Sequence, residues 1–111
     1  MDSIRQNKVA RLIQKELGIM LQKESGTLFH GSLVTVTTVR VSPDLALAKI
    51  YISLFPPAKA EETFETICHH NKHWRYELGQ KVKNQMRVVP ELAFFVDDSL
   101  DYIENIEKLI K

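Results

Sequence analysis

The sequence contains a single cysteine, Cys68, and this scarcity excludes several kinds of protein. One cysteine allows no disulfide within the chain and leaves no cysteine pair for a zinc site, so we expect a reducing compartment. No apolar run approaches the roughly 18 residues of a membrane-spanning helix, and the first residues, MDSIRQNK, lack the apolar core of a secretory signal. We therefore expect a cytoplasmic protein that does not enter a membrane.

Glycine is also rare, at four of 111 residues, and the glycine motifs of several enzyme classes are missing. There is no P-loop, no nucleophile elbow and no dinucleotide-binding pattern. In the segment CHHNKH, the spacing of His69 and His73 suits two ligands of one metal, but no third ligand is recognisable elsewhere. Asp97 and Asp98 stand where a helix cap is needed. We therefore expect no enzyme, no metal and no other cofactor.

The composition is typical of one globular domain. Of the residues, 44% are hydrophobic and 26% are charged, a balance that disordered chains do not have. A chain of 111 residues suits one compact unit and is too short for two ordinary ones. We therefore treat residues 1–111 as a single domain and expect a monomer.

Charge is unevenly distributed along the chain, although the net charge is only +1. Residues 1–23 carry five basic and two acidic side chains, residues 72–87 carry five and one, and residues 88–111 carry two and six. If the two basic segments share one side of the molecule, they form a surface for phosphate groups; otherwise their side chains are merely solvated. The candidate phosphate contacts are Lys8, Arg11, Lys15, Lys72, Arg75, Lys81, Lys83 and Arg87.

Apolar residues at helical spacing predict the helices. The first helix is expected at about residues 4–24, with its cations nearly opposite a buried stripe formed by Val9, Leu12, Ile13, Leu17 and Met20. A second helix places Phe64 and Ile67 inside, and its pattern continues after a bend near Asn71 and Lys72 through Trp74, Leu78 and Val82. A last helix is expected from Asp98 or Ser99 onward, with an apolar stripe of Leu100, Ile103, Ile106 and Ile110.

Three strands are expected at residues 33–41, 46–55 and 91–96. The first changes the parity of its apolar residues near Thr37 and Thr38, which a β-bulge or burial on both faces would explain. Pro43 suits a turn that returns the chain as an antiparallel second strand. The connection to the third strand runs through helices, which favours a parallel pair. The sequence thus predicts an α+β domain with a three-stranded mixed sheet.

The element order, helix-strand-strand-helix-helix-strand, is similar to that of a type II K-homology domain. Such a domain grips single-stranded nucleic acid through a GXXG loop between its two adjacent helices. The glycines of this chain stand at positions 18, 26, 31 and 79, and none of them forms GXXG. Either this fold binds nucleic acid in another way, or it does not bind it.

Four segments together resemble the bacterial ribosome-binding factor A family. They are RQNKVARLIQKELGIML, TVRVSPDLALAKIYIS, RYELGQKV and RVVPELAFFVDDSLDY, and they extend over nearly the whole chain. The resemblance implies a type II K-homology-like fold in which a kink between two helices, usually bearing alanine, replaces GXXG. Here the expected kink region reads His70-Asn71-Lys72-His73, with Asn71 where a small residue is expected.

The resemblance also implies a function. It is that of an assembly factor that binds the free 30S ribosomal subunit and assists late maturation of 16S rRNA, at and near its 5′ end, particularly in the cold. The implied partners are the 30S subunit and 16S rRNA, with no DNA and no membrane. Two alternatives remain open: a protein–protein adaptor that touches no RNA, and a nuclease that uses the histidines of CHHNKH.

Overall fold

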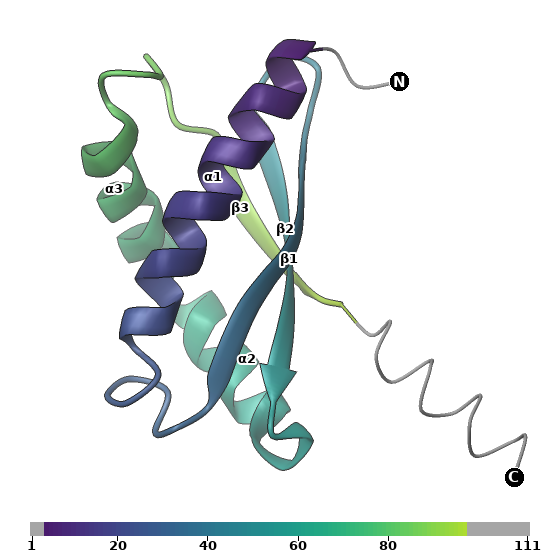
Figure 1. Ribbon diagram of the computed structural model, residues 1–111, viewed down its shortest axis with the longest axis vertical. Helices are drawn as coiled ribbons and strands as arrows, with labels where there is room; N and C mark the ends of the chain where they lie inside the picture. Colours follow the sequence, from purple (N-terminus) through teal and green to yellow (C-terminus); the bar gives the residue numbers. More distant parts are fainter. Residues whose placement is uncertain (1–3, 98–111) are drawn as a thin grey trace, which may run out of the picture.

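The computed structural model describes residues 4–97 as three helices and a three-stranded sheet (Figure 1). The elements in chain order are α1 (Ile4–Lys23), β1 (Leu33–Val41), β2 (Leu47–Phe55), the 3-10 turn η1 (Pro57–Lys59), α2 (Ala60–His69), α3 (Asn71–Val82) and β3 (Glu91–Val96). Their order agrees with the predicted one, and the bounds of α1 and of the three strands differ from the predicted bounds by at most one residue. The predicted last helix lies outside the described residues.

The sheet has the predicted mixed topology, in the order β1-β2-β3. β1 and β2 are antiparallel, and β2 and β3 are parallel. The register of the antiparallel pair shifts between Val36 and Thr38, so Thr37 is the extra residue of a bulge. The bulge predicted from the parity change is confirmed, and it lets valines on both sides of Thr37 face the core.

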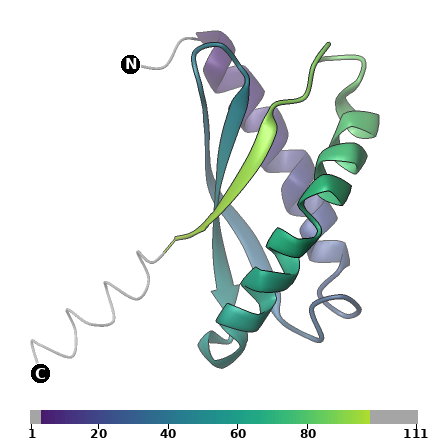
Figure 2. The ribbon, with the colours of Figure 1, turned by 180° about the vertical axis from the view of Figure 1, so that it is seen from behind.

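All three helices contribute to one core on a single face of the sheet. In β2, Ala48, Ile50 and Ile52 are fully buried, whereas the alternate residues are partly or fully exposed. Trp74 from α3 is the largest fully buried side chain. α1 and α3 pack against each other, and α2 continues the line of α3 toward the other end of the molecule (Figure 2). The opposite face of the sheet is therefore not covered by these helices.

The break between α2 and α3 falls at His70, one residue before the predicted bend. His70 has φ −98° and ψ 21°, and it belongs to neither helix. The Trp74 indole N–H donates to the Ile67 carbonyl at 2.9 Å, and the same carbonyl accepts the His70 N–H at 3.2 Å, so the buried tryptophan connects α3 to the end of α2. The Asn71 amide donates to the Leu92 carbonyl in β3 at 2.9 Å. The Asn71 side chain, which is larger than the small residue expected at this position, thus ties the break between α2 and α3 to β3.

The turn around Pro43 is built by two side chains. The Ser42 hydroxyl donates to the Asp44 carboxylate at 2.6 Å and accepts the Leu47 N–H at 3.0 Å. The bond that the Asp44 carboxylate accepts from the Ser42 hydroxyl, and after it the bond from the Ala46 N–H, hold the pKa of Asp44 below its usual value. Leu45 has φ +61°, a conformation that a leucine rarely adopts. The proline and its neighbours therefore form a tightly specified turn.

A buried side chain of α1 also holds the scaffold together. The sequence did not predict that Gln6 is buried. Its side-chain amide donates to the Val41 carbonyl at 2.8 Å and ties α1 to the end of β1.

Between residues 4 and 97, none of the helices combines the length and apolarity that crossing a bilayer requires.

Candidate functional site

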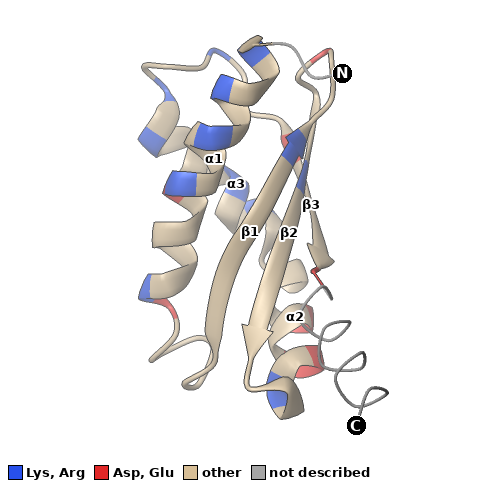
Figure 3. Cartoon of the chain, turned by 45° about the vertical axis from the view of Figure 1, so that its right-hand side comes forward, with Lys and Arg blue, Asp and Glu red and all other residues tan. Residues whose placement is uncertain are grey.

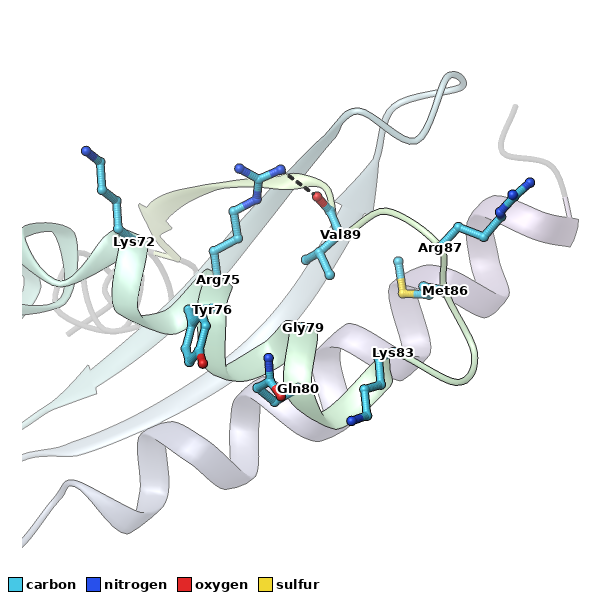
Figure 4. A pocket seen from close by; sticks show the side chains of 9 residues that line it. All are labelled: Lys72, Arg75, Tyr76, Gly79, Gln80, Lys83, Met86, Arg87 and Val89. Atoms are coloured by element: carbon cyan, nitrogen blue, oxygen red, sulfur yellow. Dashed lines mark hydrogen bonds between the residues drawn. The ribbon is translucent and has the colours of Figure 1, made fainter.

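A groove of about 530 Å³ runs along the exposed side of α3, between this helix and the segment 83–90 that leads to β3 (Figure 4). Its lining residues are Lys72, Arg75, Tyr76, Gly79, Gln80, Lys83, Met86, Arg87 and Val89. We call this hollow the α3 groove. Four of its residues are cations and none is acidic, so its electrostatic potential favours an anion.

The spacing of residues along α3 creates this concentration of charge. Lys72, Tyr76, Gly79 and Lys83 are separated by four, three and four residues, so they lie on one helical face. Met86 and Val89 provide apolar surface on the other wall. The groove therefore combines cations, an aromatic ring and apolar surface on the wall opposite α3.

The wall opposite α3 is held in place by contacts with the helix. The Val82 carbonyl accepts the N–H groups of residues 85 and 86 at 2.8 and 2.9 Å, which turns the chain back. A Cβ atom at Gly79 would lie 3.4 Å from the Val89 side chain, the distance of an ordinary van der Waals contact, so the two walls are close together at this point. The Arg75 guanidinium donates to the Val89 carbonyl at 2.8 Å. Arg75 thus serves the structure of the groove as well as its charge.

Lys81 lies in a different place from Lys83, although the sequence groups them. A second hollow, of about 390 Å³, lies between the end of α1 and α3. Lys81 lines it together with Lys23 and two carboxylates, Glu24 and Glu77. Two residues along a helix correspond to a rotation of about 200°, which places positions 81 and 83 on nearly opposite sides. Lys81 is therefore not part of the α3 groove.

The predicted cations of α1 form a second basic surface. Lys8, Arg11 and Lys15 are all exposed, and none of them lines the α3 groove. Figure 3 shows the basic positions spread along the ribbon of α1, the helix that packs against α3. Arg5 and Arg87 line a common hollow at the start of α1. The two predicted groups of cations thus lie on adjacent helices, with Arg87 near their junction.

Acidic side chains gather at the other end of the molecule. Glu61, Glu62 and Glu65 lie on α2, which Figure 3 shows below the basic part of α1. Glu77, the one acidic residue of α3, lies 3.4 Å from His73, one turn away on the same helix. The described part of the molecule is therefore electrostatically polarised, with the α3 groove in its positive part.

The CHHNKH segment has structural roles. The His70 ring nitrogen Nδ1 lies 2.9 Å from the Thr66 carbonyl in the last turn of α2. Within residues 4–97, no three histidine, cysteine or acidic side chains are grouped closely enough to hold a metal ion. Desolvation raises the pKa of the Cys68 thiol, which keeps it protonated at neutral pH. The contact of His70 thus helps to close the C-terminal end of α2.

Several residues near the predicted site were not singled out from the sequence, among them Met86 and Val89 of the groove. Tyr76 and Gln80 line the α3 groove, and Arg5 shares a hollow with Arg87. Arg5 was visible as part of the basic N-terminal segment. The sequence indicated Tyr76 only weakly, as an aromatic residue on a polar face of a predicted helix. Nothing in the sequence pointed to Gln80 as a site residue.

Comparisons with known proteins agree on one family. The model of the family described as "Ribosome-binding factor A" matches residues 5–110. Ribosome-binding factor A of Cytophaga hutchinsonii is 39% identical, with 99% of this chain and 83% of that protein covered. The Christiangramia forsetii protein of the same name is 44% identical, with 96% and 82% covered.

Solved structures share the fold. The crystal structure of ribosome-binding factor A from Thermus thermophilus superposes with a TM-score of 0.67 at 24% identity, over 82% of this chain and 94% of that one. A homology model of the Thermus thermophilus protein, fitted into a cryo-EM map of its complex with the 30S subunit, gives a TM-score of 0.55 at 24% identity, with 78% and 93% covered. The K-homology-like fold implied by the resemblance is therefore confirmed.

Proposed function

The chain belongs to the ribosome-binding factor A family, and from this premise we propose that it binds the 30S ribosomal subunit through the α3 groove. The names of its relatives support ribosome binding, and the Thermus thermophilus protein has been fitted into a map of a 30S complex. The family consists of non-catalytic factors, so the proposed action is binding.

One observation carries the proposal for the groove. Four cations line a single hollow that contains no carboxylate, in a chain whose net charge is only +1. Ribosomal RNA presents a phosphate at every nucleotide, and lysine and arginine are the side chains that neutralise phosphates. The cations of α1 extend the same basic side and would contact neighbouring phosphates. We thus keep Lys8, Arg11 and Lys15 as secondary contacts and omit Lys81.

The family resemblance also suggests what the protein does once it is bound to the subunit. We propose that the bound protein assists late maturation of 16S rRNA near its 5′ end and that this help matters most in the cold. It would act by holding RNA segments in place, because the cations of the groove would neutralise the phosphates of those segments. The protein would bind free small subunits and leave before translation.

Sedimentation of cell extract tests this function. The protein should travel with free small subunits and be missing from full ribosomes. A strain without it should accumulate 16S rRNA with an unprocessed 5′ end, more strongly at low temperature. Sedimentation at the top of the gradient, with normal 16S rRNA in the deletion strain, would contradict the proposal.

Salt dependence separates RNA binding from the adaptor alternative. If about five phosphates are neutralised, the logarithm of the affinity for purified 30S subunits should fall with the logarithm of salt concentration at a slope near −4. A protein–protein contact without RNA would give a slope near zero. The salt titration therefore decides between RNA binding and the adaptor alternative.

A further inference from the structure

We infer that the α3 groove holds one unpaired RNA base, stacked on Tyr76 and bonded along its edge by Gln80. This inference rests on the proposed function and adds the class of ligand: single-stranded RNA rather than duplex. It explains why an aromatic ring and a carboxamide stand among the cations, which phosphate binding alone does not require.

Tyr76 is exposed on α3 and takes no part in the core that the described residues form. Its exposed fraction is 68%, unusually high for a large aromatic side chain. Within residues 4–97, its ring makes no contact with another ring and its hydroxyl makes no hydrogen bond. Trp74, two residues earlier, is 1% exposed and forms the core. Tyr76 and Gln80 line both the α3 groove and the hollow beside Lys81, so the Tyr76 ring is available as a stacking surface at the edge of the groove (Figure 4).

Gln80 stands one helical turn after Tyr76, on the same side of α3 (Figure 4). A carboxamide carries both donors and an acceptor, so it can pair with the mixed donor and acceptor edge of a base. Within the described part of the chain, this side chain has no hydrogen-bond partner. Met86 and Val89 supply apolar surface opposite, against which the second face of a base can pack.

The cations are arranged around this place. Lys72 lies one turn before Tyr76, while Lys83 and Arg87 lie beyond Gln80 toward the other end of the groove (Figure 4). Phosphates on both sides of a stacked nucleotide would thus meet positive charge. A base within a duplex is already stacked on both faces, so only an unpaired base can use the tyrosine ring. The arrangement of ring, carboxamide and cations therefore selects single strands.

A second aromatic surface is an alternative site for the stacked base, and it supplies a control variant for the test. Tyr51 and Phe95 stack on each other at a centroid distance of 5.4 Å on the open face of the sheet. Phe95 is 41% exposed. Because these rings already pair with each other, and this face lacks the groove and its four cations, we assign the base to Tyr76.

The test compares Tyr76→Leu, Tyr76→Phe and the control Phe95→Leu. The probes are an unstructured RNA of about 12 nucleotides and the same strand annealed to its complement. The parent should bind the single strand more tightly than the duplex. Loss of one stacked base corresponds to about 1–3 kcal/mol, so Tyr76→Leu should weaken single-strand binding roughly 5- to 150-fold and abolish the preference. Tyr76→Phe and Phe95→Leu should stay within about twofold of the parent.

Salt slopes distinguish this inference from the proposed function. Tyr76→Leu removes no charge, so its salt slope should equal that of the parent. A parent that binds with a steep slope while Tyr76→Leu binds equally well would overturn the stacked base and leave the phosphate groove standing. A parent with no salt-dependent binding would overturn the groove itself.

Two further results would also refute the inference. One is a parent that prefers the duplex, a measurement that needs no variant. The other is a loss of single-strand binding in Phe95→Leu but not in Tyr76→Leu, which would move the base to the sheet. Thermal melts of each variant establish that it is folded, and Gln80→Ala, which should also weaken single-strand binding, replaces Tyr76→Leu if that variant does not fold.

Discussion

Replacing Val82 with alanine separates the scaffold of the groove from its binding surface. Val82 is fully buried at the end of α3. The change removes two buried methyl groups, which corresponds to about 1.6 kcal/mol of transfer free energy, and the cavity left behind adds up to about 1 kcal/mol. Alanine regains about 0.5 kcal/mol through its higher helix propensity. The net loss in the free energy of unfolding should be about 2 kcal/mol.

The assay is a thermal melt followed by a binding titration. For a domain of this size, about 2 kcal/mol should lower the melting temperature by roughly 8–10 °C. Below that transition, the variant should bind 30S subunits like the parent, because the Val82 carbonyl still accepts the two N–H groups that turn the chain.

The exposed neighbour Lys83 is the control for this experiment. Lys83→Ala should change stability by no more than about 0.5 kcal/mol but should flatten the salt slope of binding by about 0.7–0.9. If the folded Val82→Ala variant lost affinity while Lys83→Ala kept it, the division between core and binding surface would be wrong.

Three further predictions concern the break and the turn. Asn71→Ala loses the bond to the Leu92 carbonyl and should cost about 1 kcal/mol in a denaturant titration; no measurable loss would mean that this bond does not secure the break. Pro43→Ala should cost at most about 1 kcal/mol and leave 30S binding intact, whereas collapse of binding would make the turn a contact site. The lowered pKa of Asp44 means that its contribution to stability is complete above the unfolded value of about 3.9 and is lost as pH falls through the folded value. Asp44→Asn should therefore reduce the fall of the melting temperature below about pH 4, and an unchanged acid profile would contradict this.

The strands were predictable because their patterns are local. The side-chain period of a strand is two residues, so the parity change between Val36 and Val39 indicated the bulge that the register contains. The alternating apolar residues Ala48, Ile50 and Ile52 were equally clear in the sequence, and all three are fully buried. Such signals need no knowledge of what a segment packs against.

The groove was only partly predictable because one of its walls is irregular. The segment 83–90 has no hydrophobic period, and its position depends on contacts such as Arg75 with the Val89 carbonyl, 14 residues away. The same limit applies to Asn71, whose partner Leu92 is 21 residues away. Charge counting found the cations of α3 but joined Lys81 to Lys83, because it ignored the rotation of the helix between them.

A matched pair of double variants tests the central claim most directly. Lys72→Ala with Lys83→Ala removes two cations from the α3 groove, and Lys23→Ala with Lys81→Ala removes two from the acidic hollow beside it. Both proteins have the same net charge, so a general electrostatic effect would act on them equally. Titrated against purified 30S subunits at several salt concentrations, the groove variant should bind more weakly, with a slope flatter by about 1.4–1.8, while the other should stay within about 0.5 of the parental slope. Equal slopes in the two variants, or a larger change in the Lys23 and Lys81 variant, would contradict the assignment of RNA binding to the groove.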